Sequence, residues 1–251
     1  MYIDDIEKEL SVVSVLDSLK STVDLPPKSY TCYACENRVC ETCDNNHGFY
    51  SSSVTQCPRK VAFQWLYGPK EIEDPEAKKR MYYGTLIHSI VSNILLSRGI
   101  ASAAEVKRYF PLGEGFFLSA KVDIISHDRL VEIKTTKLRN IRYMKKPRDN
   151  YVHQLNLYLH FFEYDIGEII VIPADSFEVS VLMADGDSVE ESILESIGDW
   201  KSFVIEYDRD MALSDIEFFL NIARTIKDGK MPLRKIGKNC DYCEWREECL
   251  S

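Results

Sequence analysis

Two neighbouring segments constrain this chain more than any other feature. Residues 131–135, Val-Glu-Ile-Lys-Thr, alternate between apolar and polar side chains, which is typical of a strand and places Glu132 and Lys134 on one face. Residues 115–125 predict a partner strand, and His, Asp and Arg at 127–129 predict the turn between them. The sequence therefore predicts a hairpin that carries charged residues.

Pairing within this hairpin would bring the carboxylates of Asp123 and Glu132 together, with the ammonium of Lys134 beside them. Two close carboxylates repel, and a hard divalent cation such as Mg²⁺ relieves the repulsion with oxygen ligands. The lysine can then orient or activate a water against a phosphodiester. This layout is typical of a metal-dependent phosphodiesterase. The alternative is a solvated face with a weak surface ion pair.

The bulk composition is that of an ordinary globular protein. The 251 residues, 45% hydrophobic and 28% charged, suffice for one elaborated domain or for one domain plus a small module. No apolar stretch reaches the ~20 residues that a bilayer crossing needs, and the first ten residues are acidic and amphipathic, unlike a secretory signal. We therefore expect a cytoplasmic protein without a membrane partner.

A local basic segment contrasts with the overall acidity. The net charge of −9 argues against non-specific duplex binding over the whole surface. Residues 134–148, however, contain seven Lys or Arg and no acid, and they begin at the proposed site. Such a segment can hold a polyanionic substrate, and the alternative is a solvated charge run. The candidate DNA-contacting residues are Lys137, Arg139, Arg142, Lys145 and Lys146.

The eight cysteines predict metal thiolates. Seven of them lie in two tightly spaced polar clusters, which fits scattered buried cysteines badly, and without an export signal this spacing favours metal binding over disulfides. The three cysteines of the tail cannot close a four-coordinate site and need a fourth ligand from elsewhere. Cys57 is the natural candidate, because the N-terminal quartet is complete without it. Spacing leaves zinc and iron–sulfur open, although the quartet suits one zinc. The quartet is Cys32, Cys35, Cys40 and Cys43, and the second set is Cys57, Cys240, Cys243 and Cys249.

Periodicity predicts a mixed α/β core. The expected helices span 3–20, 75–97, 149–164, 187–206 and 213–228, with a further helix that Ser53 caps and that Gly68-Pro69 ends. The expected strands lie near 104–110, 115–126, 129–135, 167–173 and 176–183. We divide the chain into an N-terminal helix with a cysteine-rich module (1–50) and a main domain (51–251), which a cluster of Cys57 with residues 240–249 would close.

Six residues in chain order resemble the RecB-like branch of the PD-(D/E)xK nuclease superfamily. They are His88, Asp123, Glu132, Lys134, Gln154 and Tyr158. Cys57 with the tail cysteines is similar to the iron–sulfur subset of that branch, and size and order are most similar to the CRISPR-associated RecB-like exonucleases. The resemblance covers about residues 50–251. It implies a restriction-endonuclease-like core, a mixed sheet flanked by helices, with a helical N-terminal region and a cysteine-rich tail. The N-terminal quartet is not part of the family pattern.

The resemblance also implies roles for the charged residues. His88, Asp123 and Glu132 would bind Mg²⁺ or Mn²⁺, with the backbone carbonyl of Ile133 as a further ligand. Lys134 would position the attacking water and offset developing charge. The structural alternative for His88 is a satisfied core histidine.

For the remaining motif residues the resemblance implies support rather than ligation. Gln154 and Tyr158 would steady the lysine and the DNA backbone, although either could be part of an ordinary helix face. The second cysteine set, Cys57 and the tail trio, would hold one [4Fe-4S] cluster.

The implied function is a metal-dependent DNA exonuclease that acts on single-stranded DNA from 5′ to 3′. In that family setting it would trim DNA for CRISPR spacer acquisition, with integration proteins as partners. One alternative is an iron–sulfur and zinc adaptor that binds DNA in a processing complex. Another is a viral or repair nuclease unrelated to CRISPR.

Overall fold

The computed structural model describes residues 48–70, 74–113, 115–175 and 200–250. The predicted helix over 3–20, the N-terminal cysteine quartet and the predicted strand over 176–183 lie outside these ranges. None of the helices in the described ranges combines the length and the apolar character that a membrane crossing requires.

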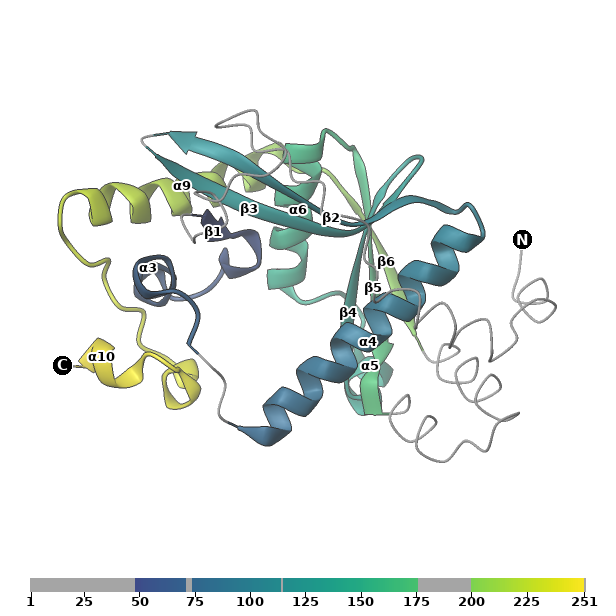
Figure 1. Ribbon diagram of the computed structural model, residues 1–251, viewed down its shortest axis with the longest axis horizontal. Helices are drawn as coiled ribbons and strands as arrows, with labels where there is room; N and C mark the ends of the chain where they lie inside the picture. The colour runs from purple at the N-terminus through teal and green to yellow at the C-terminus, as the bar shows by residue number, and fades with distance from the viewer. Residues whose placement is uncertain (1–47, 71–73, 114, 176–199, 251) are drawn as a thin grey trace.

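The described residues form a six-stranded mixed sheet with helices on both faces, as the sequence predicts (Figure 1). Strands β1, β3, β4, β5 and β6 follow one another in the sheet, and β2 pairs with β3. The pairs β1–β3 and β4–β5 are parallel, whereas β2–β3, β3–β4 and β5–β6 are antiparallel. The strands are β1 (Gly48–Tyr50), β2 (Ala101–Gly113), β3 (Phe116–Ser126), β4 (Leu130–Thr136), β5 (Ile166–Pro173) and β6 (Lys201–Glu206).

Alternation along β5 assigns the helices to the two faces. Ile170 and Ile172 pack with α4, whereas Ile169 and Val171 pack with α5 and α6. The β4–β5 pair is parallel, so the chain must cross over between them, and α5 and α6 make this crossover. The helices are α3 (Pro58–Tyr67), α4 (Pro75–Ser97), α5 (Leu138–Tyr143), α6 (Asp149–Phe162), α9 (Arg209–Lys227) and α10 (Arg246–Leu250).

Strand β3 is shared between two parts of the sheet. Its last residues pair with β4, at Ile124 and Ile125, whereas residues 117–119 pair with β1. The long β2–β3 ribbon therefore continues past the central strands to a second layer with α3 and α9, where Phe49 and Phe219 are buried (Figure 1). The residue just before Ile124 thus lies where β3 leaves β4.

Several predicted bounds are confirmed. The helix over 75–97 is α4, and Gly99 follows it with a φ of 65°. The predicted turn at 127–129 joins β3 to β4, where the N–H of Ser126 donates to the carbonyl of Arg129. The predicted helices over 149–164 and 213–228 correspond to α6 and α9.

Two predicted helix bounds are wrong. The helix expected after Ser53 begins at Pro58 with Cys57 before it, because proline lacks an N–H and fits the first turn of a helix rather than its interior. Residues 201–206, expected as the end of a helix over 187–206, form β6 instead. Half-buried and exposed residues alternate along β6, which pairs with the edge of β5.

Candidate active site

Asp123 lies where β3 and β4 separate. Ile124 pairs with Val131 and Ile125 with Leu130, and among the described residues the two strands make no other pair. Asp123 and Glu132 occupy the next opposed positions, where the pairing has ended. Instead, Oδ2 of Asp123 accepts the backbone N–H of Ile133 at 2.8 Å. The side chain of Asp123 thereby takes the place of a strand carbonyl. Ile133 contributes its N–H here, and ligation by its carbonyl stays a prediction.

Lys134, which is half-buried, forms one network with the buried side chains of Glu132, Gln154 and Tyr158. The ammonium of Lys134 donates to Oε1 of Glu132 at 2.6 Å and to Oε1 of Gln154 at 2.9 Å. The amide nitrogen of Gln154 donates to Oε1 of Glu132 and to the hydroxyl of Tyr158, both at 2.8 Å. Gln154 and Tyr158 share one face of α6 because they are four residues apart. Both N–H donors of the amide are thereby used.

The surroundings of Glu132 do not fully compensate the negative charge of its carboxylate. It is 2% exposed, and its second oxygen, Oε2, is buried without a hydrogen-bond partner among the described residues. Burial and the charge of Asp123 raise the pKa of Glu132 to about 7, against the opposing effect of Lys134. Burial alone would lower the pKa of Lys134, but the charge and hydrogen bond of Glu132 raise it. The lysine therefore stays an ammonium.

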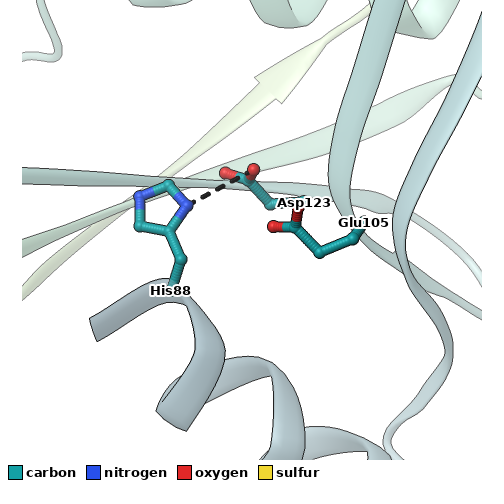
Figure 2. A group of neighbouring side chains, drawn as sticks. All are labelled: His88, Glu105 and Asp123. Atoms are coloured by element: carbon teal, nitrogen blue, oxygen red, sulfur yellow. Dashed lines mark ion pairs between the residues drawn. The ribbon is translucent and has the colours of Figure 1, made fainter. Parts of the chain in front are cut away.

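His88, Glu105 and Asp123 form a group of possible metal ligands (Figure 2). Nδ1 of His88 on α4 lies 3.4 Å from Oδ1 of Asp123, and one ligand atom from each of the three residues lies within 4.8 Å of the other two. Burial would lower the pKa of His88, but the hydrogen bond to Asp123 and the surrounding negative charge raise it. Imidazole and carboxylate oxygens suit Mn²⁺, and oxygens alone suit Mg²⁺. Glu132 borders this group but is not one of its members.

Glu105 was not among the site residues predicted from the sequence. Ala104 pairs with Ile124 and Val106 with Val122, so Glu105 lies opposite Asp123 across the β2–β3 pair. The signal was present, because the glycines at 113 and 115 mark a turn between the two predicted strands, and a hairpin joined there gives this register. The predicted strands over 104–110 and 115–126 were not paired with each other, and the position of Glu105 depends on that pairing.

The basic segment lines a basic depression, open to solvent, of about 700 Å³. The residues that line it are Arg139, Asn140, Tyr143, Met144, Lys145, Lys146, Pro147, Arg148 and Asp149. Of the other two candidates, Lys137 precedes α5 and Arg142 lies in its last turn, and both are exposed. The guanidinium of Arg148 and the ammonium of Lys134 both lie over the ring of Tyr151, at 5.7 and 5.2 Å. Tyr151 therefore links the basic depression, through Arg148, to the carboxylate network.

The tail returns to the start of α3. The backbone N–H of Lys235 donates to Sγ of Cys57 at 3.3 Å, and Sγ of Cys240 lies 3.9 Å from the carbonyl of Lys235. Arg59 donates to the carbonyls of Pro232 and Cys249. The structure thus brings Cys57 to the tail. Among the residues described, no three of the four thiols come as close together as the ligand atoms around Asp123 do.

Comparisons with known proteins agree with this fold. Neither the protein-family models nor the curated proteins gave a match. Among solved structures, that of SSO0001 aligns with a TM-score of 0.56 and 16% identity, over 94% of this chain and 93% of that one. A structure of LHK-Exo in complex with dAMP aligns with a TM-score of 0.50 and 16% identity, over 73% and 91%. The chain shares the fold of these proteins. At this identity the likeness extends to the fold alone.

Proposed function

We propose that this protein is a nuclease that hydrolyses the phosphodiester bonds of DNA with the help of a divalent cation. The network of Lys134, Glu132 and Gln154 beside Asp123 carries this proposal. A surface ion pair would be solvated and weak, whereas this one is buried and includes a carboxyl whose pKa is raised to about 7. Such perturbed groups gather at functional sites. The shared fold with LHK-Exo, a protein named as an exonuclease, supports the proposal.

The residues present fit Mg²⁺ or Mn²⁺. His88 and Asp123 lie within 3.4 Å of each other, and the partnerless Oε2 of Glu132 is an acceptor that a nearby cation or its water ligands would satisfy. A cation at this place would polarise a phosphate oxygen and make a bound water more acidic.

Lys134 has the second role in this proposal. Its ammonium is fixed by two hydrogen bonds, to Glu132 and to Gln154, and its third N–H donor would orient the attacking water. It also offsets the charge that develops on the phosphate oxygens. Gln154 and Tyr158 keep the lysine in place because their own hydrogen bonds hold the amide in one orientation.

The basic depression is the proposed path of the DNA strand. Arg139, Lys145 and Lys146 would bind phosphates, and Tyr143, which is 84% exposed, offers a ring on which a base can stack. Stacking favours unpaired bases, which supports a single-stranded substrate. Exonucleolytic action from 5′ to 3′ and a role in CRISPR spacer acquisition rest on the motif resemblance. Gene neighbourhood would distinguish that role from viral or repair work.

We also propose that the second cysteine set holds a [4Fe-4S] cluster. The contacts of Cys57 and Cys240 with the backbone of Lys235 support a common site, and an N–H that donates to sulfur is a feature of such clusters. A brown protein that absorbs near ~400 nm and is bleached by Cys240→Ser would agree. A colourless protein with stoichiometric zinc would exclude iron. Zinc in the N-terminal quartet is proposed from its spacing.

The nuclease proposal is tested with end-labelled single- and double-stranded DNA in Mg²⁺, in Mn²⁺ and after removal of divalent cations. Lys134→Ala and Glu132→Ala should remain folded and lose cleavage. Matched changes at exposed positions, Lys230→Ala and Glu206→Ala, should cut like the parent. Parent rates for both site variants would refute the proposal. A protein that binds DNA but cuts none in any metal would be the adaptor.

A further inference from the structure

We propose that Glu105 is a ligand of the divalent cation, and that His88, Glu105 and Asp123 are its primary binding group. This inference rests on the proposed metal-dependent site and changes its ligand set. Glu132 then has a different role: its buried oxygen accepts hydrogen bonds from the water ligands that such a cation retains.

The first argument is convergence from separate elements. His88 comes from α4, Glu105 from β2 and Asp123 from β3, and their ligand atoms lie within 4.8 Å of one another. Figure 2 shows the imidazole of the helix and the two strand carboxylates directed toward one region. One imidazole with two carboxylates is a donor set that favours Mn²⁺ over the harder Ca²⁺ and Mg²⁺.

The second argument is the partnerless oxygen of Glu132. This residue is 2% exposed, and Oε2 has no hydrogen-bond partner among the described residues, whereas Oε1 accepts from both Lys134 and Gln154. A buried acceptor without a donor is unfavourable. The carboxylate borders Asp123 and His88, and a hydrated cation beside these residues would supply the donors.

The third argument is the backbone of Glu105. Its φ is +55°, in the left-handed region that residues other than glycine rarely adopt. The only other described residue of this kind apart from glycine is Glu163, with a φ of 61°, and it ends helix α6, where left-handed residues are common. Glu105 lies inside a strand, where no turn or helix end requires this conformation. Such strain is found where it directs a side chain to a site.

A change at Lys121 should alter cation affinity in the direction opposite to a change at Glu105. Its ammonium pairs with the carboxylate of Glu105 from the neighbouring strand β3. A cation at Glu105 must compete with this ion pair. Removal of the ammonium by Lys121→Met should therefore tighten cation binding, whereas removal of the carboxylate should weaken it.

The test measures the binding of Mn²⁺ to the full-length protein. The electron paramagnetic resonance signal of free Mn²⁺ reports how much of the ion remains unbound. Glu105→Gln should weaken Mn²⁺ binding by at least about 10-fold, because changing a residue that merely hydrogen-bonds to a metal ligand already costs about 10–100-fold. Glu163→Gln, the matched glutamate with a positive φ, should bind like the parent. Glu132→Gln should change affinity by only a few-fold and yet lose cleavage. Lys121→Met should bind more tightly.

Two results would overturn the inference. One is parental Mn²⁺ affinity in Glu105→Gln, and the other is loss of binding in Glu132→Gln while Glu105→Gln keeps it. Thermal unfolding checks that each variant folds, and Glu105→Asn serves as a second variant because asparagine tolerates the left-handed region.

The nuclease proposal and this inference can fail separately. If the parent binds Mn²⁺ through Glu105 but cuts no DNA, the inference holds and the nuclease proposal falls. If cleavage needs Mn²⁺ but is unchanged in Glu105→Gln, the inference falls and the nuclease proposal holds.

Discussion

The two groups of candidate metal ligands in this protein are held in different ways. Around Asp123 and Glu132, each 6% exposed or less, side chains from the sheet and α6 hydrogen-bond one another. Around Cys57 and Cys240 the thiols are half-buried, and their contacts are with backbone atoms of Lys235. The first group is therefore arranged by the fold itself, whereas the second depends on how the tail docks.

That docking rests on a small aromatic and ionic contact with α3. Trp245 is 4% exposed and stacks on Phe63 with ring centroids 5.2 Å apart, and the ammonium of Lys70 lies 4.6 Å from the centre of its ring. Lys60 pairs with Glu244 at 3.0 Å. We expect the carboxylate site to keep its geometry without metal, and the tail to gain much of its order from metal binding.

The largest effect should come from Asp123→Asn, which breaks the first region without a change of shape. The amide oxygen can still accept the N–H of Ile133, but the negative charge beside His88 is lost. We expect single-turnover cleavage to fall by about 10²–10³-fold, the scale for loss of one electrostatic contribution. The control is Asp165→Asn, an exposed site. A parental rate in Asp123→Asn would contradict the comparison.

Trp245→Ala should disrupt the docking of the cysteine tail and leave the carboxylate site intact. Loss of a buried aromatic ring costs about 3–5 kcal/mol, and here the loss falls on the contact between the tail and α3. We expect faster proteolysis of the tail and a lower metal content, with cleavage by freshly prepared protein reduced far less. The matched change is Trp200→Ala, at a ring that is 40% exposed. Equal loss of cleavage and metal content would show that the regions are not independent.

The pH dependence of stability isolates the charge of Glu132. Its pKa rises from 4.5 in the unfolded chain to about 7 in the folded protein, so the folded protein binds more protons between these values. Its contribution to the free energy of unfolding is full below pH 4.5 and is lost as the pH rises through 7. As the pH rises from 4.5 to 7, the free energy of unfolding of the parent should therefore fall relative to that of Glu132→Gln. The fall should be about 1.4 kcal/mol for each unit of pKa shift. Urea unfolding without divalent cations checks this, and parallel pH profiles would refute it.

Gly167→Ala should give a smaller effect that links packing to chemistry. An added Cβ would lie 2.7 Å from Cδ2 and 2.9 Å from Cγ of Leu155, which is fully buried. Such overpacking costs about 1–3 kcal/mol. It would also displace Gln154, which precedes Leu155 on α6, from Lys134. Both urea stability and the cleavage rate should fall. Gly48→Ala, where the nearest atom is at 3.5 Å, should change neither much, and equal effects would contradict this account.

Local sequence patterns predicted the elements that alternation or helical periodicity defines. The hairpin with Asp123 and Glu132, helix α4 and the shared face of Gln154 and Tyr158 all follow from spacing over a few residues. These features need no knowledge of the rest of the fold.

Features that depend on distant pairing could not be predicted in the same way. Residues 201–206 form a strand because the edge of β5 is available to them, and their short apolar run fits a helix equally well. Glu105 reaches the site through the register of β2 and β3 and through an unusual φ. The approach of Cys57 to the tail, 178 positions away at Lys235, was predicted from the number of cysteines and from the family resemblance rather than from local periodicity.

The most direct test of the central claim is an anomalous difference map at the manganese edge, from crystals of the full-length protein grown with Mn²⁺. We predict a peak within bonding distance of His88, Glu105 and Asp123, with Oε2 of Glu132 facing it through a water. A protein that cuts DNA in Mn²⁺ but shows no peak beside Asp123 would contradict the account.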